Sequence, residues 1–360
     1  GRDARAAACL ATDRLAGLPW GGMQPVTRRL LWLALSAATL GVATLTRNAS
    51  AQVSGYRVES FTIHDGLPSQ AITDVTETSD GYLWIAAGGI LARFDGYLFR
   101  AYTQANTPSL VRRVHHLHAG IGDTLWILDE GNAVFAHAGG TVVPILPPSD
   151  FDLDGLIQDG DGTLYGLGSG SVWRLHRGGG THSEVLPRIS LGVTRIRSGR
   201  NGSGRAWIVD SNAVLRELGA NARRSRRTLF PAAVATSRST GELYTLSARG
   251  GLRDVVRATG DVVTSFAEAG TYFPAILDRD GRLWVVSAAT YDVFERGRTE
   301  PVARIPSPEP GAAGMLFEGE SGCVWVTETV LMKACRVPFS TIPLSITPRT
   351  NGKRPMKRLM

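Results

Sequence analysis

"SDGYLWIAAGGILARFDG", residues 79–96, decides the fold, because it combines two turns, a glycine pair and a tryptophan inside a short apolar run. Such a stretch is either a glycine-rich loop that binds phosphate or one copy of a structural repeat. A phosphate loop would occur once, whereas a repeat would recur along the chain at a fixed interval.

The pattern of a turn with glycine, followed within a few residues by an aromatic in an apolar run, recurs seven times. Its aromatic residues are Trp84, Trp126, Tyr165, Trp207, Tyr244, Trp284 and Trp325, at intervals of 42, 39, 42, 37, 40 and 41 residues. A period near 40 is typical of propeller blades with about four short strands each. The sequence therefore predicts an all-β fold, a seven-bladed β-propeller with four antiparallel strands per blade.

The first blade shows its four strands most clearly. They are expected at residues 71–78, 82–87, 90–94 and 97–103. The aromatic on the second strand is predicted to be structural, since a large flat ring can fill the wedge between two blades. Residues 56–62 resemble a fourth strand without a blade in front of it, so they are predicted to complete the last blade. Residues 338–342, "PFSTI", are the alternative for that position.

The formal charge of +7 comes from the two ends of the chain. Residues 1–51 hold six Lys and Arg with two Asp and Glu, and residues 344–360 hold five with none, which leaves 28 basic and 30 acidic residues in between. A positive charge confined to the ends does not indicate a nucleic-acid-binding face.

Residues 23–51 have the pattern of a secretory signal peptide. Arg28 and Arg29 precede an apolar run at 30–45, and Ala49-Ser50-Ala51 forms a cleavage motif. Residues 1–22 are expected to be a non-native upstream stretch, residues 52–343 the propeller, and residues 344–360 a basic tail, disordered or the start of a truncated region. The predicted location is periplasmic or extracytoplasmic. An uncleaved anchor is the alternative interpretation of the apolar run.

Cys323 and Cys335 lie symmetrically about residue 329, the expected tip of a hairpin. They therefore have the spacing to face each other across two antiparallel strands. An oxidising compartment permits a disulfide between them, and a pair of buried free thiols is the alternative.

The stretch "FTIHDGLPSQAITDVTETSDGYLWIAAGGILARFDGYLFRAYT", residues 61–103, resembles the two-component regulator propeller repeats of bacterial receptors, with "DGLPS", "DGYLW" and "GGILARFDG" carrying the match. The resemblance implies the first propeller of an extracytoplasmic sensor region. In that family a second propeller, a membrane helix and a histidine kinase or diguanylate cyclase follow. Any kinase or cyclase activity would lie in such later domains, because this sequence contains none of their motifs.

A ligand is expected at the channel mouth, where the loops between the second and third strands and between successive blades gather. The polar residues predicted there are His64, Asp65, Arg112, Asp129, Glu130, Asn132, Asp210, Asn212, Tyr291, Asp292 and Glu328. Acids, amides and a tyrosine suit a hydroxyl-rich ligand such as an oligosaccharide. Their alternative role is that of ordinary loop residues.

Two clusters contain residue types that bind metals, the histidines of "VHHLH" at residues 114–118 and the acidic turn at 159–162. Neither has a complete set of ligands at useful spacing, so no metal and no cofactor is predicted. Alternation places His116 and His118 on one face of their strand with Val114, and His115 on the other face with Arg113.

Function is predicted as ligand sensing in a signal-transduction receptor, with a carbohydrate-like signal. The expected partners are a small-molecule or oligosaccharide ligand and a second propeller or protomer, with no nucleic acid. A membrane contact is expected only through missing downstream segments or an uncleaved signal. No catalytic motif such as G-x-S-x-G or H-E-x-x-H is present. A protein-interaction scaffold and a polysaccharide lyase or hydrolase are the alternatives.

Overall fold

The computed structural model divides the chain into two units, Gly1–Ala49 and Ser50–Met360, and all the residues it describes belong to the second unit. The described residues are 50–53, 55–149, 152–168, 170–176, 183–186, 197–198, 206–209, 214–218, 225–227, 234–236, 243–249, 252–257, 262–267, 275–287, 289–296, 298–311 and 314–337. Within these ranges, no helix is both long enough and apolar enough to cross a membrane.

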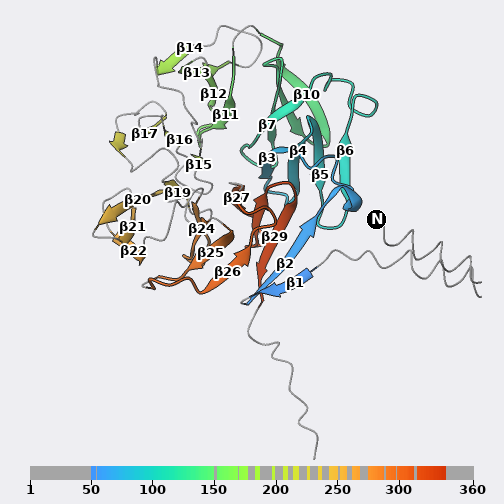
Figure 1. Cartoon of the computed structure of the whole chain (residues 1–360). Coiled ribbons are helices and arrows are strands. Elements are labelled where there is room, and N and C mark those ends of the chain that lie inside the picture. Colours follow the sequence, from blue (N-terminus) through green and yellow to red (C-terminus); the bar gives the residue numbers. More distant parts are fainter. Residues whose placement is uncertain are drawn as a thin grey trace, which may run out of the picture. The chain divides into compact units, whose positions relative to one another are not determined.

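Seven antiparallel sheets make up the described part of the chain (Figure 1). Blade one consists of β3 (Ile72–Glu77), β4 (Leu83–Ala87), β5 (Ile90–Phe94) and β6 (Phe99–Tyr102). Blade two consists of β7 (Val114–Ala119), β8 (Leu125–Asp129), β9 (Val134–Ala138) and β10 (Thr141–Leu146). Blade three consists of β11 (Gly155–Gln158), β12 (Leu164–Gly168), β13 (Ser171–Leu175) and β14 (Ser183–Leu186).

The next three sheets repeat the same strand order. Blade four consists of β15 (Arg197–Ser198), β16 (Ala206–Val209), β17 (Val214–Glu217) and β18 (Ser225–Arg227). Blade five consists of β19 (Val234–Thr236), β20 (Leu243–Arg249), β21 (Leu252–Arg257) and β22 (Val262–Ala267). Blade six consists of β23 (Ala275–Leu277), β24 (Leu283–Val286), β25 (Thr290–Phe294) and β26 (Ala303–Pro306).

The first strands of the blades contact one another in sequence. Strand β7 contacts β3 on one side and β11 on the other, and β11 contacts β15. Strand β23 likewise contacts β19 and β27. Each sheet therefore has an inner strand that faces the neighbouring blades, and the prediction of an all-β propeller is confirmed.

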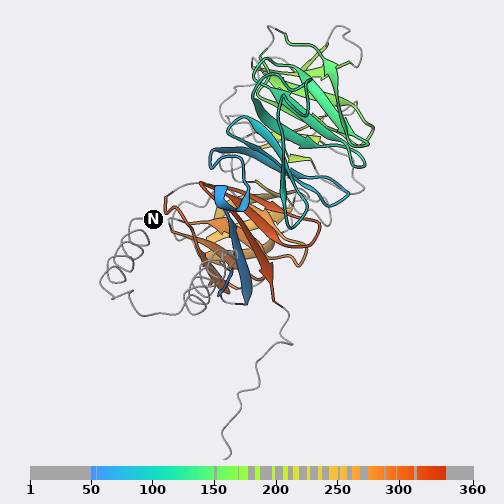
Figure 2. The ribbon, with the colours of Figure 1, turned by 90° about the vertical axis from the view of Figure 1, so that its right-hand side faces the viewer.

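Blade seven is completed by the N-terminal part of the described chain. It contains β27 (Met315–Glu318), β28 (Val324–Thr327), β29 (Leu331–Arg336), β2 (Tyr56–Phe61) and the outermost strand β1 (Ser50–Val53). Strand β2 pairs with β29 from Tyr56–Arg336 to Phe61–Leu331, and the two strands lie side by side in Figures 1 and 2. The expected role of residues 56–62 is thus fulfilled, and residues 338–342 lie outside the described part.

The strand ends of blade one differ slightly from those expected. Tyr97 and Leu98 were assigned to the fourth strand, but they belong to the turn before β6. The Asp95 side chain accepts hydrogen bonds from the backbone N–H groups of Tyr97 (2.9 Å) and Leu98 (2.8 Å). A short acidic side chain that caps its own turn delays the start of the next strand.

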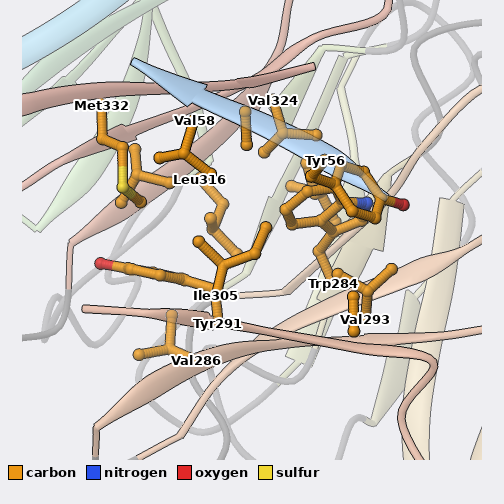
Figure 3. Close-up of a cluster of buried hydrophobic side chains, with 14 residues drawn as sticks. Tyr56, Val58, Trp284, Val286, Tyr291, Val293, Ile305, Leu316, Val324 and Met332 are labelled. Atoms are coloured by element: carbon orange, nitrogen blue, oxygen red, sulfur yellow. The ribbon is translucent and has the colours of Figure 1, made fainter. Parts of the chain in front are cut away.

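The recurring aromatics lie in the cores between blades. Six of them are at most 5% exposed, namely Trp84, Trp126, Tyr165, Tyr244, Trp284 and Trp325, while Trp207 is half-buried. The Trp84 indole donates to Thr78 Oγ1 (3.0 Å) and the Trp284 indole to Asp278 Oδ2 (2.9 Å) in their own blades, whereas the Trp126 indole donates to Gln158 Oε1 (3.2 Å) of the next blade. Figure 3 shows the core between blades six and seven, where the Tyr56 ring meets Trp284 edge-on.

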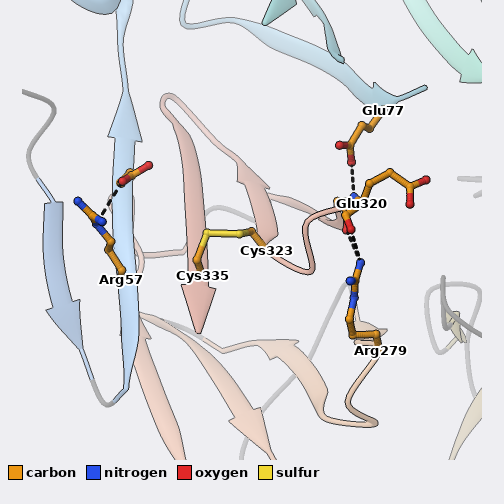
Figure 4. Close-up of a disulfide and its surroundings, with 8 residues drawn as sticks. Arg57, Glu77, Arg279, Glu320, Cys323 and Cys335 are labelled. Atoms are coloured by element: carbon orange, nitrogen blue, oxygen red, sulfur yellow. Dashed lines mark hydrogen bonds and ion pairs between the residues drawn. A yellow bond between two sulfur atoms is a disulfide. The ribbon is translucent and has the colours of Figure 1, made fainter. Parts of the chain in front are cut away.

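Three of the inner strands end in a polar side chain that holds a turn of the preceding blade, and we call these contacts turn clasps. Glu77 accepts from the backbone N–H of Glu320 (2.7 Å; Figure 4), Gln158 from Ile121 (2.9 Å) and Glu318 from Arg279 (2.8 Å). Each clasp residue lies seven positions before its blade aromatic. The clasps thus fix blades one, three and seven to their predecessors.

Cys323 and Cys335 form a disulfide across β28 and β29, with 4.3 Å between their Cα atoms (Figure 4). The register that pairs Val324 with Ala334 puts the two cysteines directly opposite each other. The disulfide thus links two strands of the blade that also holds β2.

Candidate functional site

The edge of the sheets that carries the loops between second and third strands, and between blades, is the expected ligand-binding face. Hydrogen bonds join neighbouring blades along this edge. The backbone N–H of Val114 donates to Gly89 O (2.8 Å), and that of Ser149 donates to Gly131 O (3.2 Å). We call this edge, over blades one to three, the mouth.

Three of the predicted ligand-binding residues in this region instead hold the loops themselves. Asp129 is buried, and its Oδ1 accepts from the N–H groups of Gly131 (2.8 Å) and Ala133 (2.9 Å). Asn132 has a positive φ of 60° and links its turn to the next blade, by donating to Ser149 O and accepting from Leu153 N. Asp65 caps the short 3-10 helix η2 (Ile63–Asp65).

Three predicted residues in blades six and seven also form hydrogen bonds with other side chains of the propeller. The Tyr291 ring is fully buried, and its hydroxyl donates to Glu328, whose carboxylate also accepts from Ser307 Oγ (2.9 Å). Burial raises the pKa of Tyr291, and the Glu328 carboxylate raises it further. Asp292 is buried and accepts from Thr290 Oγ1 (2.6 Å). These three side chains thus have partners within the fold, and their contact with a ligand stays a prediction.

The remaining predicted residues divide into two groups. His64, Arg112 and Glu130 have exposed side chains at the mouth. Asp210 and Asn212 lie outside the described residues. The structure therefore leaves three of the predicted residues open to solvent, all in the loops of blades one and two.

Residues that alternation misplaced add to the mouth. The register of β3 and β4 shifts between Ile72 and Asp74, and that of β7 and β8 shifts between Val114 and His116. These β-bulges set Thr73 and His115 out of the regular strand pairing. Strand β7 begins at Val114, so Arg112 and Arg113 belong to the preceding loop rather than to the strand.

The position eleven residues before the blade aromatic supplies a side chain near the mouth in blades one to three, and in blades one and two this residue is the bulge residue. Thr73 occupies this position in blade one, His115 in blade two and Asp154 in blade three, and Thr73 and Asp154 are exposed. Counting backwards from the aromatic would have found all three side chains in the sequence. A search for motifs missed them because the residue type changes from blade to blade.

Opposite charges lie next to each other at the mouth. Arg113 Nε pairs with Glu130 Oε1 at 2.9 Å, and both side chains are more than half exposed. A methyl group on Gly131 would lie 2.0 Å from Arg112 Nη1, so this guanidinium rests directly on the glycine. The exposed polar residues of the mouth, which we call the mouth set, are His64, Thr73, Arg112, Arg113, Glu130 and Asp154.

The other two histidines of "VHHLH" bridge the inner strands. His116 Nδ1 lies 2.7 Å from Asp74 Oδ2 and its Nε2 lies 3.2 Å from Leu156 O, while His118 Nε2 accepts from Gln158 N (3.0 Å). Burial alone would lower the pKa of His116, but the Asp74 carboxylate outweighs it and the pKa is raised. Among the described residues, no group of three or more His, Cys, Asp or Glu is arranged to hold a metal ion.

Comparison with known proteins places this architecture among propellers. Residues 66–89 match the family described as Two component regulator propeller. The extracellular domains of two B. thetaiotaomicron proteins, the hybrid two component system BT3049 and the one component system BT4673, superpose with TM-scores of 0.54 and 0.53 at 15% and 14% identity. The matches cover 79% and 76% of this chain, and 42% and 39% of those chains.

An enzyme shares the fold as well. A streptogramin B lyase superposes with a TM-score of 0.59 at 14% identity, over 78% of this chain and 97% of the lyase. No curated protein sequence matches the chain. At such identities the similarity establishes the fold alone. The chain thus carries a two-component regulator propeller repeat within a β-propeller of the kind found in the extracellular domains of two-component systems.

Proposed function

We propose that this chain is the extracytoplasmic sensing propeller of a bacterial signal-transduction receptor. The observation that carries the proposal is the match of residues 66–89 to the regulator-propeller repeat. These residues form β3 and β4 and end at the glycine pair Gly88-Gly89, in the turn between the second and third strands. The receptor domains named above provide the parallel for an extracytoplasmic location.

The proposed ligand is an oligosaccharide that binds over the mouth set. Guanidinium, imidazole, hydroxyl and carboxylate groups there offer both donors and acceptors to sugar hydroxyls. The Arg113–Glu130 pair presents both charges at one point, and Arg112 lies beside it on Gly131. An acidic sugar would engage the arginines in paired hydrogen bonds, so uronic-acid oligosaccharides are the preferred class.

Calorimetry with the full chain tests this proposal, using neutral and uronic-acid oligosaccharides as probes. Binding of a uronic-acid oligosaccharide that weakens at least tenfold in Arg112→Ala supports it. Arg57→Ala is the matched control, because Arg57 is comparably exposed on β2 of blade seven and pairs only locally with Glu59 (3.3 Å). Equal loss in both variants, or no binding of any probe, contradicts the proposed site.

A catalytic function is the second candidate, which the shared fold of the streptogramin B lyase favours. We propose binding without turnover as the first candidate, because the family match at residues 66–89 is to a regulator-propeller repeat. Incubating the full chain with the same oligosaccharides and measuring new reducing ends or unsaturated products separates the two functions. Product formation that is lost in His64→Gln would favour the enzyme.

A further inference from the structure

One core position of blade two breaks the pattern of its neighbours. In the blades where this pair is described, the residue before the blade aromatic pairs across the second and third strands with an apolar partner, except in blade two, where Leu125 pairs with His137. The corresponding partners in the other blades with a described pair are Phe94, Leu175, Phe294 and Ala334. The repeat itself thus shows that a histidine is not needed for this position to fold.

His137 is buried against the aromatic core of blade one. Its residue is 5% exposed, its ring lies 4.5 Å from the Trp84 ring and 6.0 Å from the Tyr102 ring, and neither ring nitrogen has a hydrogen-bond partner. A buried polar group without a partner carries a desolvation cost that an apolar side chain would not carry.

The charged groups around His137 shift its pKa in opposite directions. Arg93 of β5 opposes protonation, whereas Asp80 and Asp123, in the first turns of blades one and two, favour it. Tyr102 of β6 is the titratable ring that contacts it. Burial is the largest influence, and it lowers the pKa of His137 below its ordinary value of 6.5.

We propose that His137 makes the junction between blades one and two an acid-responsive element: the junction packs tightly while the imidazole is neutral and loosens when the imidazole takes up a proton. The cation has no acceptor inside the junction, so protonation favours states in which β9 moves away from Trp84 and the ring reaches water. Blades one and two carry five of the six residues of the mouth set, so acid would also weaken ligand binding, a consequence that rests on the proposed function.

The sign of the effect follows from linkage. A histidine whose pKa is lower in the folded state binds its proton more readily when the chain unfolds. Its stabilising contribution is therefore complete above pH 6.5 and is lost as the pH falls below that value. For one proton, the unfolding equilibrium constant rises up to about tenfold per pH unit in this range.

Denaturant unfolding of the full chain between pH 7.5 and 4.5 tests the proposal in the native chain and in His137→Phe, the residue that blades one and six use at this position. As the pH falls, the unfolding equilibrium constant of the native chain is expected to rise relative to that of His137→Phe, by up to about tenfold per pH unit. Comparing the two chains cancels the contributions that the other histidines make to the pH dependence. Parallel curves for the native chain and His137→Phe overturn the proposal.

A second measurement needs only the native fold. Imidazole NMR resonances of the full chain are followed against pH, and the resonance missing in His137→Leu identifies His137. Titration below 6.5 supports the proposal, and titration at or above 6.5 overturns it. Because neither experiment uses a ligand, failure of the oligosaccharide proposal leaves this result unaffected.

Discussion

Replacing Gln158 by leucine tests whether the turn clasps hold the blades together. Gln158 is 8% exposed, and its Oε1 accepts from Ile121 N (2.9 Å) and from Trp126 Nε1 (3.2 Å), while its Nε2 donates to Gly162 O (3.0 Å). Leucine has a similar volume, so the main loss is polar. The Trp126 donor is deeply buried and accounts for about 2 kcal/mol, and the Ile121 donor near the surface adds about 1 kcal/mol.

The free energy of unfolding, measured by urea denaturation, is therefore expected to fall by about 3 kcal/mol in Gln158→Leu. Hydrogen exchange at the backbone N–H of Ile121 should also be faster in this variant, because this group loses its acceptor. Gln158→Glu is the matched control, because Glu77 and Glu318 perform the same role in blades one and seven. A loss below about 0.5 kcal/mol in Gln158→Leu would refute the reasoning, since surface substitutions remain within that range.

Two further predictions concern blade seven and the inner strands. Replacing both Cys323 and Cys335 by alanine should lower the free energy of unfolding by about 3 kcal/mol, because the disulfide closes a short loop in the unfolded chain. Thermal unfolding with and without a reductant checks this prediction. An unchanged midpoint temperature would argue against it. Asp74→Asn should lower the pKa of His116, because the raising carboxylate is gone. In the native chain the stabilising contribution of this pair is complete below pH 6.5 and is lost as the pH rises through the folded pKa of His116. Imidazole NMR measures the pKa of His116 in both chains, and equal pKa values would argue against the pairing.

The fold could be predicted from the sequence because its determinants are local and repeated. Seven aromatics at intervals near 40 predict the blades, and glycine-rich turns predict where each strand ends. Some strand ends differ from the prediction by one or two residues, for example where Asp95 accepts from the backbone of its own turn and where β7 begins at Val114. Two segments are candidates from the sequence for completing blade seven, residues 56–62 and residues 338–342, and the structure shows that β2 pairs with β29 there.

The candidate site was predicted less well, for a physical reason. Loop position alone cannot separate a side chain that faces solvent, such as Arg112, from one that holds the loop, such as Asp129. Strand alternation alone also misses the β-bulges at Thr73 and His115, because a strand with one extra residue has the same composition as a regular one, and only their fixed distance from the blade aromatic marks them. The partners of Glu328 come from two separate segments, Tyr291 in β25 and residues 307–309 after β26, and only the folded chain brings them together.

The pairing of β2 with β29 has a consequence for the time course of folding. Phe61 and Leu331 are partners, yet roughly 270 residues separate them, which at ~5–20 residues per second takes a ribosome roughly 15 to 50 seconds. During that interval Tyr56, Val58 and Phe61, all buried in the finished blade, have no sheet to join. A strand with apolar side chains and open backbone groups can pair with other chains. A protein that holds the early chain extended would therefore increase the yield of folded propeller more than one that acts on the finished blades.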